Sequence, residues 1–242
     1  KALRRYLIDA IETVRLSCQF MIIGGKTGSA KTHLLNSLNF SIDLEGLANH
    51  RGSAFGKRIQ SQPSQIDFEN QLAIALLKLP FENAQQLFLE DESRSIGSMS
   101  IPKEFHDKMA GSPIAMLEES MAARVETIYK DYIYSNFQDF QKDDAEAAQK
   151  NFSKFLLGSL ERIQRRLGAE KHTELHAVME QALTHNDPAE SEALHRQWIK
   201  RLLCDYYDPM YEYQINKKLD RVIYRGSREE FLAWASHINR QP

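Results

Sequence analysis

Cysteine and long apolar runs are both scarce in this chain of 242 residues. Its two cysteines, Cys18 and Cys204, lie far apart, which excludes a disulfide framework or a cysteine-based zinc cluster. No apolar run approaches the roughly 20 residues that a membrane-spanning helix needs. The basic residues at 1–6 are not followed by the apolar core of a secretory signal. We therefore expect a cytoplasmic protein with no membrane partner.

A strong charge of either sign is also absent, because 31 Lys and Arg nearly balance 33 Asp and Glu for a formal net charge of −2. This balance argues against a strongly basic nucleic-acid binder, and we expect no DNA partner, although a local basic face for RNA stays open. The length fits one large domain or one domain with an insertion. The first residue is Lys1 rather than methionine, which favours a fragment of a longer protein.

Short apolar runs alternate with helical patterns along most of the chain. Their spacing predicts five strands, at residues 20–23, 40–42, 86–89, 113–117 and 221–224. Such alternation is typical of an α/β fold, and we predict a P-loop NTPase-like parallel sheet of about five strands with helices on both faces. We interpret 1–119 as the P-loop core, 120–205 as a helical insertion and candidate tRNA contact, and 206–242 as the last strand and terminal helix that complete the core.

A glycine-rich loop between the first strand and the next helix carries the chemistry. It matches G-x-x-x-x-G-K-[ST] except at the second glycine, and its candidate phosphate-binding residues are Gly25, Lys26, Thr27, Gly28, Ser29, Ala30, Lys31 and Thr32. Backbone N–H groups would cradle phosphate oxygens, Lys31 would reach the terminal phosphates, and the Thr32 hydroxyl would hold Mg²⁺. Ala30 replaces the second glycine, which keeps the N–H donor but adds a methyl group. The alternative is a glycine-rich turn with a solvated lysine.

An acidic cluster ends the third predicted strand. Either Glu90 or Asp91 could orient Mg²⁺ or its waters, as the strand-end carboxylate of P-loop enzymes does. The pattern does not separate the two, and we favour Asp91 as the metal ligand and a catalytic residue. In the alternative, one of them only caps the next segment.

The loop after the second strand lies at the carboxyl edge of the sheet, where ligands of open α/β sheets bind. It carries Asp43, Glu45 and Arg51 as candidate catalytic residues and His50 as a candidate ligand or tRNA contact. A solvated loop held by its glycines is the alternative.

Four arginines are further candidates for contact with a ligand or with tRNA. Arg94 and Arg124 could supply positive charge to a diphosphate, and a surface role for Arg124 stays open. Arg165 and Arg166 form a basic run that either contacts tRNA or is a solvated helix face.

Four unusual blocks, at 43–56, 62–65, 90–97 and 206–211, resemble tRNA 2-selenouridine synthases. The similarity runs from residue 1 nearly to the C-terminus, and it covers the part of that family that follows a rhodanese domain. It implies a tRNA-modifying transferase that replaces the sulfur of wobble 2-thiouridine by selenium from selenophosphate, through a uridine S-geranylated by geranyl diphosphate.

The resemblance also implies which chemistry this chain lacks. In the family the rhodanese domain carries the selenium-transfer cysteine, and neither Cys18 nor Cys204 is placed like it. We therefore expect tRNA and the chain's own rhodanese domain as partners, selenophosphate in that domain, and Mg²⁺ with geranyl diphosphate or ATP/GTP at the P-loop. Two alternatives stay open: a nucleotide-hydrolysing or phosphotransferase enzyme with Asp43 or Glu45 as base, and a non-catalytic tRNA-binding module.

Overall fold

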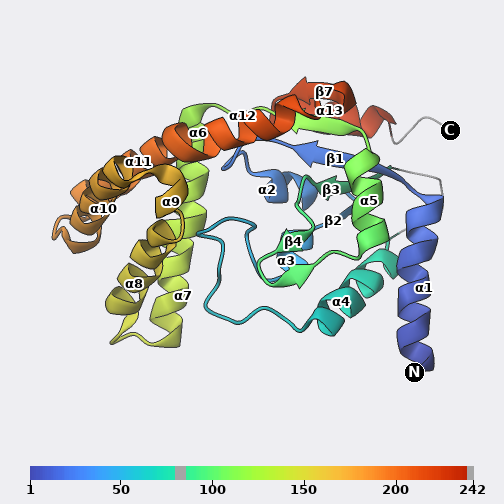
Figure 1. The fold of residues 1–242 in the computed structure, drawn as a ribbon, viewed down its shortest axis with the longest axis horizontal. Helices are drawn as coiled ribbons and strands as arrows, with labels where there is room; N and C mark the ends of the chain where they lie inside the picture. The colour runs from blue at the N-terminus through green and yellow to red at the C-terminus, as the bar shows by residue number, and fades with distance from the viewer. Residues whose placement is uncertain (80–85, 239–242) are drawn as a thin grey trace.

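The computed structural model describes residues 1–79 and 86–238. A five-stranded sheet in the order β2-β3-β1-β6-β7 forms its centre, and all neighbouring strands are parallel (Figure 1). The strands are β1 (Gln19–Gly24), β2 (Ser41–Ile42), β3 (Gln86–Glu90), β6 (Ile114–Leu117) and β7 (Val222–Gly226). The predicted α/β class and parallel sheet of five strands are thus confirmed.

Helices cover both faces of the sheet because the central strand is apolar on both sides. Phe20 and Ile22 of β1 pack into one core, and Met21 and Ile23 into the other. The first core contains residues of α1 (Ala2–Ser17), α3 (Leu44–Leu47), α4 (Gln65–Leu77) and α5 (Lys103–Gly111), and the second contains residues of α2 (Lys31–Leu35) and α13 (Arg228–Ile238).

A helical layer between β6 and β7 stands beside the sheet (Figure 1). Its own core surrounds Leu156, Leu160 and Trp198, and Phe55 of the loop after β2 packs into it. The layer comprises α6 (Met121–Ile128), η1 (Tyr129–Tyr134), α7 (Ser135–Asp143), α8 (Ala148–Glu161), α9 (Gln164–Leu167), α10 (Ala169–Thr184), α11 (Pro188–Leu202), η2 (Leu203–Tyr207), α12 (Asp208–Asn216) and η3 (Leu219–Arg221). Across the described ranges, no helix has the length and apolarity required to span a membrane.

Two π-helical segments interrupt this layer. The η1 segment joins α6 to α7, and η2 joins α11 to α12, without a break in either helix. π-helical turns are rare and frequently lie at functional sites. Both segments lie on the side of the helical layer next to the P-loop, because Tyr132 of η1 and Leu203 of η2 line the same cavity as Thr27 of that loop.

A small antiparallel hairpin of β4 (Ser95–Ile96) and β5 (Met99–Ser100) follows the acidic end of β3. Gly97 makes its turn with φ 62°. Gln62 fixes the hairpin to the preceding loop, because its amide donates to the carbonyls of Ala48 and Ile96 and accepts from the Ser98 N–H. The hairpin thereby holds the segment after Glu90 close to the loop after β2.

Candidate functional site

The phosphate loop, residues 25–30, runs from the end of β1 into α2, and Gly25, Gly28 and Ala30 of this loop have positive φ. Gly28 has φ 83°, and a Cβ there would lie 2.8 Å from the Arg124 carbonyl oxygen. Ala30, with φ 58° and ψ 36°, adopts the left-handed conformation that favours glycine. The loop therefore keeps a turned shape despite the alanine.

The two polar residues at the start of α2 face the carboxyl end of the sheet. Lys31 Nζ donates to the Gly25 carbonyl at 2.9 Å, so the ammonium lies over the loop. The Thr32 hydroxyl donates to Glu90 Oε1 at 2.6 Å. This arrangement brings a lysine, a hydroxyl and a carboxylate together at one end of the phosphate loop.

Glu90, and not Asp91, lies beside Thr32. Glu90 is 1% exposed, and its Oε2 has no hydrogen-bond partner among residues 1–79 and 86–238. Asp91 accepts instead from Lys218 Nζ, at 2.7 and 2.9 Å. Successive residues of a strand point to opposite faces, so only one of the two acids can meet the phosphate loop. The structure separates Asp91, the favoured metal ligand, from Thr32.

Glu45 and Glu92 complete a cluster of three glutamates with Glu90. One carboxylate oxygen from each lies within 4.8 Å of the others. Burial, followed by repulsion between the carboxylates, raises the pKa of each residue from its usual 4.5 to about 8. Without a cation, the cluster therefore holds protons at neutral pH.

This donor set fits Mg²⁺. Mg²⁺ prefers hard oxygen ligands, and the cluster offers carboxylate oxygens next to the Thr32 hydroxyl. The unpartnered Oε2 of Glu90 is a buried acceptor of the kind that a cation satisfies.

The loop after β2 contributes Glu45 to this cluster and anchors its other candidates elsewhere. Asp43 caps α3, since its Oδ1 accepts from the Gly46 N–H at 2.7 Å, and burial raises its pKa. Arg51 donates to Asn136 Oδ1 at 2.7 Å and lies over the Tyr132 ring. His50 Nδ1 accepts from the Gly52 N–H at 3.1 Å, and burial lowers the His50 pKa.

The remaining arginine candidates lie apart from one another. Arg94 is exposed at the mouth of a cavity of about 250 Å³ on the α5 side of β3, which Lys218 and Arg221 also line. Arg165 and Arg166 are exposed on α9, at the surface of the helical layer.

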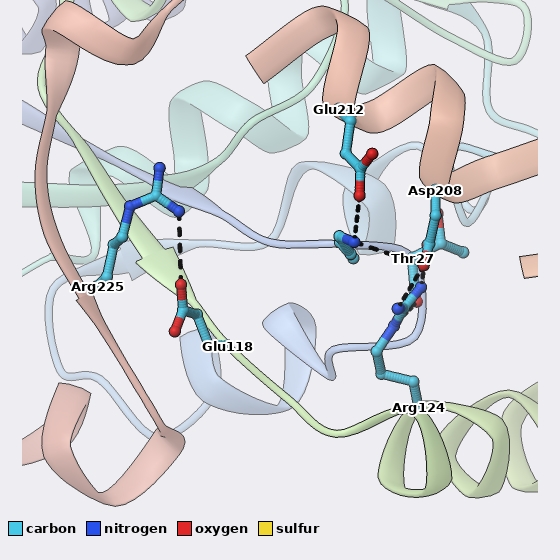
Figure 2. Close-up of polar contacts among 7 residues, drawn as sticks. Thr27, Glu118, Arg124, Asp208, Glu212 and Arg225 are labelled. Carbon is cyan, nitrogen blue, oxygen red and sulfur yellow. Dashed lines mark hydrogen bonds and ion pairs between the residues drawn. The ribbon is translucent and has the colours of Figure 1, made fainter. Parts of the chain in front are cut away.

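Arg124 is buried to 3% exposure beneath the phosphate loop. Its Nε donates to the Thr27 carbonyl at 2.9 Å, and its two terminal nitrogens donate to the Asp208 carboxylate of α12. Figure 2 shows this fork. Lys26 Nζ of the loop donates to Glu212 Oε1 of the same helix at 2.7 Å. The guanidinium thus contacts the loop backbone and not the solvent.

An apolar cavity adjoins the same side of the loop. Thr27 lines it together with Phe55, with Ile128 and Tyr132 from α6 and η1, and with Leu203 and Tyr207 from η2. Its volume is about 20 Å³, enough for roughly one water. The two π-helical segments therefore meet across a narrow apolar space directly beside the phosphate loop.

The sequence alone did not assign a role to Glu92 or Asp208, which lie far along the chain from the phosphate loop. Glu92 and Asp208 stand in the blocks that carry the family resemblance, but no local pattern gives either a role. A buried ion pair between residues 84 apart has no short-range signal. The only available hint is a charged residue placed on the apolar face of a helix, as Arg124 is on α6.

Comparisons with known proteins identify the family of this chain. Residues 18–241 match the family model described as "tRNA 2-selenouridine synthase AAA domain". The chain is 44% identical over 236 residues to a tRNA 2-selenouridine synthase of Marinobacter nauticus, covering 97% of this chain and 64% of that protein. The corresponding protein of Shewanella oneidensis is 42% identical over 241 residues, covering 99% and 64%.

The chain spans about 64% of the length of both relatives. No solved structure matches the fold. The family model matches residues 18–241, a range of this chain that includes the phosphate loop, the three glutamates and the Arg124–Asp208 pair. This chain belongs to the tRNA 2-selenouridine synthase AAA domain family.

Proposed function

We propose that this chain is the diphosphate-binding part of a cytoplasmic tRNA-modifying transferase that converts wobble 2-thiouridine to 2-selenouridine through a geranylated intermediate. Its relatives are named for the selenouridine product. The ligand of the phosphate loop is geranyl diphosphate, tRNA is the second substrate, and selenium transfer belongs to a rhodanese domain outside this chain.

One observation favours a prenyl diphosphate over a nucleotide. The cavity that shares Thr27 with the phosphate loop is lined mainly by aliphatic side chains and aromatic rings, and Ser53 also lines it. A base and ribose would leave polar groups unpaired there, whereas a prenyl chain would gain about 25 cal/mol for each Å² of apolar surface removed from water. Because the cavity is narrow, the chain enters by parting the walls formed by the two π-helical segments.

The residues around the loop suit departure of a diphosphate. The thiouridine sulfur forms a bond to C1 of the geranyl group as the C1–O bond breaks. The electron pair of that bond leaves with the diphosphate, and the base releases its N3 proton. Lys31 and the loop N–H groups stabilise the charge that develops on the leaving oxygens. No protein nucleophile is needed.

Thr32 and Glu90 would hold Mg²⁺, with Glu45 and Glu92 beside them. The ion supplies positive charge to the leaving diphosphate. This assignment replaces Asp91 by Glu90 as the strand-end ligand, because Asp91 is paired with Lys218. Glu45 and Glu92 release their protons when the cation binds.

A nucleotide-hydrolysing enzyme is the second candidate, and the position of Glu45 favours it. Glu45 combines a raised pKa of about 8 with a place near Lys31, as a general base requires. Asp43 is less suited to that role, since its carboxylate already caps α3. Turnover of ATP or GTP that depends on both Lys31 and Glu45 would favour hydrolysis.

The test compares ligands and a single charge at the loop. Isothermal titration of the protein with geranyl diphosphate and with ATP, each with Mg²⁺, is expected to give tighter binding of geranyl diphosphate. Lys31→Ala in the complete enzyme should abolish geranylation of a thiolated anticodon stem-loop, measured by mass spectrometry. Lys78→Ala removes an exposed lysine at the end of α4 and should leave it unchanged. Normal geranylation by Lys31→Ala would refute the proposal.

A further inference from the structure

The phosphate loop is held from outside by a buried ion pair between two helices of the helical layer. Arg124 on α6 reaches three acceptors at once: the Thr27 carbonyl at 2.9 Å and the two Asp208 carboxylate oxygens at 3.0 and 2.5 Å (Figure 2). Planar guanidinium is suited to this, because its donors are fixed in a fork. One side chain thereby joins the loop, α6 and α12.

The backbone of α6 supports the same stretch of the loop. The Arg124 carbonyl oxygen packs so closely against Gly28 that a Cβ on this residue would lie only 2.8 Å from it. Only glycine therefore fits at position 28. Thr27 is therefore bonded through its carbonyl, and Gly28 is packed against the helix. Because both residues are restrained by α6, the peptide plane between Thr27 and Gly28 has little freedom to turn.

The lysine at the start of the loop is drawn to the same helix. Lys26 Nζ lies 2.7 Å from Glu212 Oε1 and 3.6 Å from Asp208 Oδ2. Lys31 remains over the loop backbone. Asp208 and Glu212 of α12 thus hold the Lys26 ammonium, and Lys31 is the lysine whose ammonium lies over the loop backbone.

We infer that Arg124 and Asp208 are positioning residues, which fix the peptide planes of residues 26–28 so that the loop N–H groups converge on a diphosphate. The inference rests on the proposed function in that the ligand is a diphosphate. We call the contacts of Arg124 with Asp208 and with the Thr27 carbonyl the clamp. Preorganised donors bind and stabilise charge better than donors that must reorient, so loss of the clamp weakens phosphate binding. Neither residue contacts the ligand itself.

A more exposed arginine–carboxylate pair that also involves α6 provides the control. Arg196 of α11 forks onto Glu126 of α6, with Nε and Nη2 at 3.2 and 2.7 Å from the same carboxylate oxygen, and no hydrogen bond links either residue to the loop in the described part of the chain. Arg124→Lys keeps a cation opposite Asp208 but loses the two-pronged contact with its carboxylate and the hydrogen bond from Nε to the Thr27 carbonyl. Arg196→Lys makes the same chemical change away from the loop.

Two measurements test the inference. Amide hydrogen exchange of the peptide covering residues 25–30 reads the loop directly, and titration with inorganic pyrophosphate and Mg²⁺ reads its grip without a prenyl chain. Arg124→Lys and Asp208→Asn should each accelerate loop exchange about tenfold and weaken pyrophosphate binding about tenfold. Arg196→Lys and Glu126→Gln should change both by less than twofold.

The outcomes separate this inference from the proposed function. Unchanged loop exchange in Arg124→Lys would overturn it, as would faster exchange with unchanged pyrophosphate affinity. Equal effects of Arg124→Lys and Arg196→Lys would also overturn it, because they would reduce the pair to general helix packing. Pyrophosphate binding that is weakened as expected, in a protein that does not bind geranyl diphosphate, would refute the proposed ligand and uphold the clamp.

Discussion

Protons held by the three glutamates should make the stability of the free protein fall as pH rises. The pKa of Glu90 is about 8 in the folded protein and near 4.5 when the chain is unfolded. Between these values the folded state binds more protons than the unfolded state, so the free energy of unfolding decreases with pH. The stabilisation is complete below about pH 4.5 and is lost as pH approaches 8.

The size of the effect follows from one retained proton. Each pKa unit corresponds to about 1.4 kcal/mol, and one proton retained up to pH 8 is worth about 2 kcal/mol between pH 6 and pH 8. For a chain of this size that amounts to roughly 4–8 °C in Tm. We assign this proton to Glu90, because its side chain is 1% exposed, whereas Glu45 and Glu92 are only partly buried.

Glu90→Gln removes this titrating proton and leaves the other ionisable side chains of the protein in place. Glutamine can still accept from the Thr32 hydroxyl but has no proton to lose, so its Tm should match the wild type at pH 6 and exceed it at pH 8. Differential scanning fluorimetry from pH 5.5 to 8.5, without divalent cations, measures both slopes. Glu104→Gln, which changes an exposed carboxylate of α5, is the control. Superimposable curves for wild type and Glu90→Gln would refute the reasoning.

Two further changes test the loop and the apolar cavity. Ala30→Gly should raise the free energy of unfolding, measured in urea titrations, by up to about 1 kcal/mol. Relief of the strained left-handed conformation of Ala30 is worth about 1–2 kcal/mol, which exceeds the cost of the greater freedom that glycine gives the unfolded chain. A loss of stability would show that the alanine methyl group is well packed. Leu203→Phe should fill the cavity and weaken geranyl diphosphate binding at least tenfold in calorimetric titrations while inorganic pyrophosphate binds as before. Equal weakening of both ligands would place the prenyl chain elsewhere.

Local patterns predicted the parallel core well, because each signal lies within one short segment. An apolar strand, a glycine-rich loop and a helix in succession define the phosphate site without any distant contact. Capping of α4 is equally local, since Ser64 Oγ accepts from the Asp67 N–H at 3.2 Å. Such features survive in any packing of the remaining chain.

The missed features depend on length or distance. The two-residue strands β4 and β5 are too short to show alternation. The apolar positions at 152, 156, 160, 163 and 167 keep helical spacing across the break between α8 and α9, so the pattern hides it. Which of Glu90 and Asp91 faces Thr32 is set by strand register, and the Arg124–Asp208 fork is set by tertiary packing.

Charge balance links the glutamate cluster to the ligand. Three carboxylates beside a phosphate loop would repel a diphosphate if they were ionised, and Lys31 alone cannot offset them. In the free protein, protons remove this repulsion, as the raised pKa values indicate. A cation can replace those protons and attract the diphosphate at the same time, so cation and diphosphate should each strengthen the binding of the other by the same factor. We therefore expect the acidic cluster to favour a ligand that arrives with a divalent cation, so that phosphate ligands should bind more weakly without Mg²⁺.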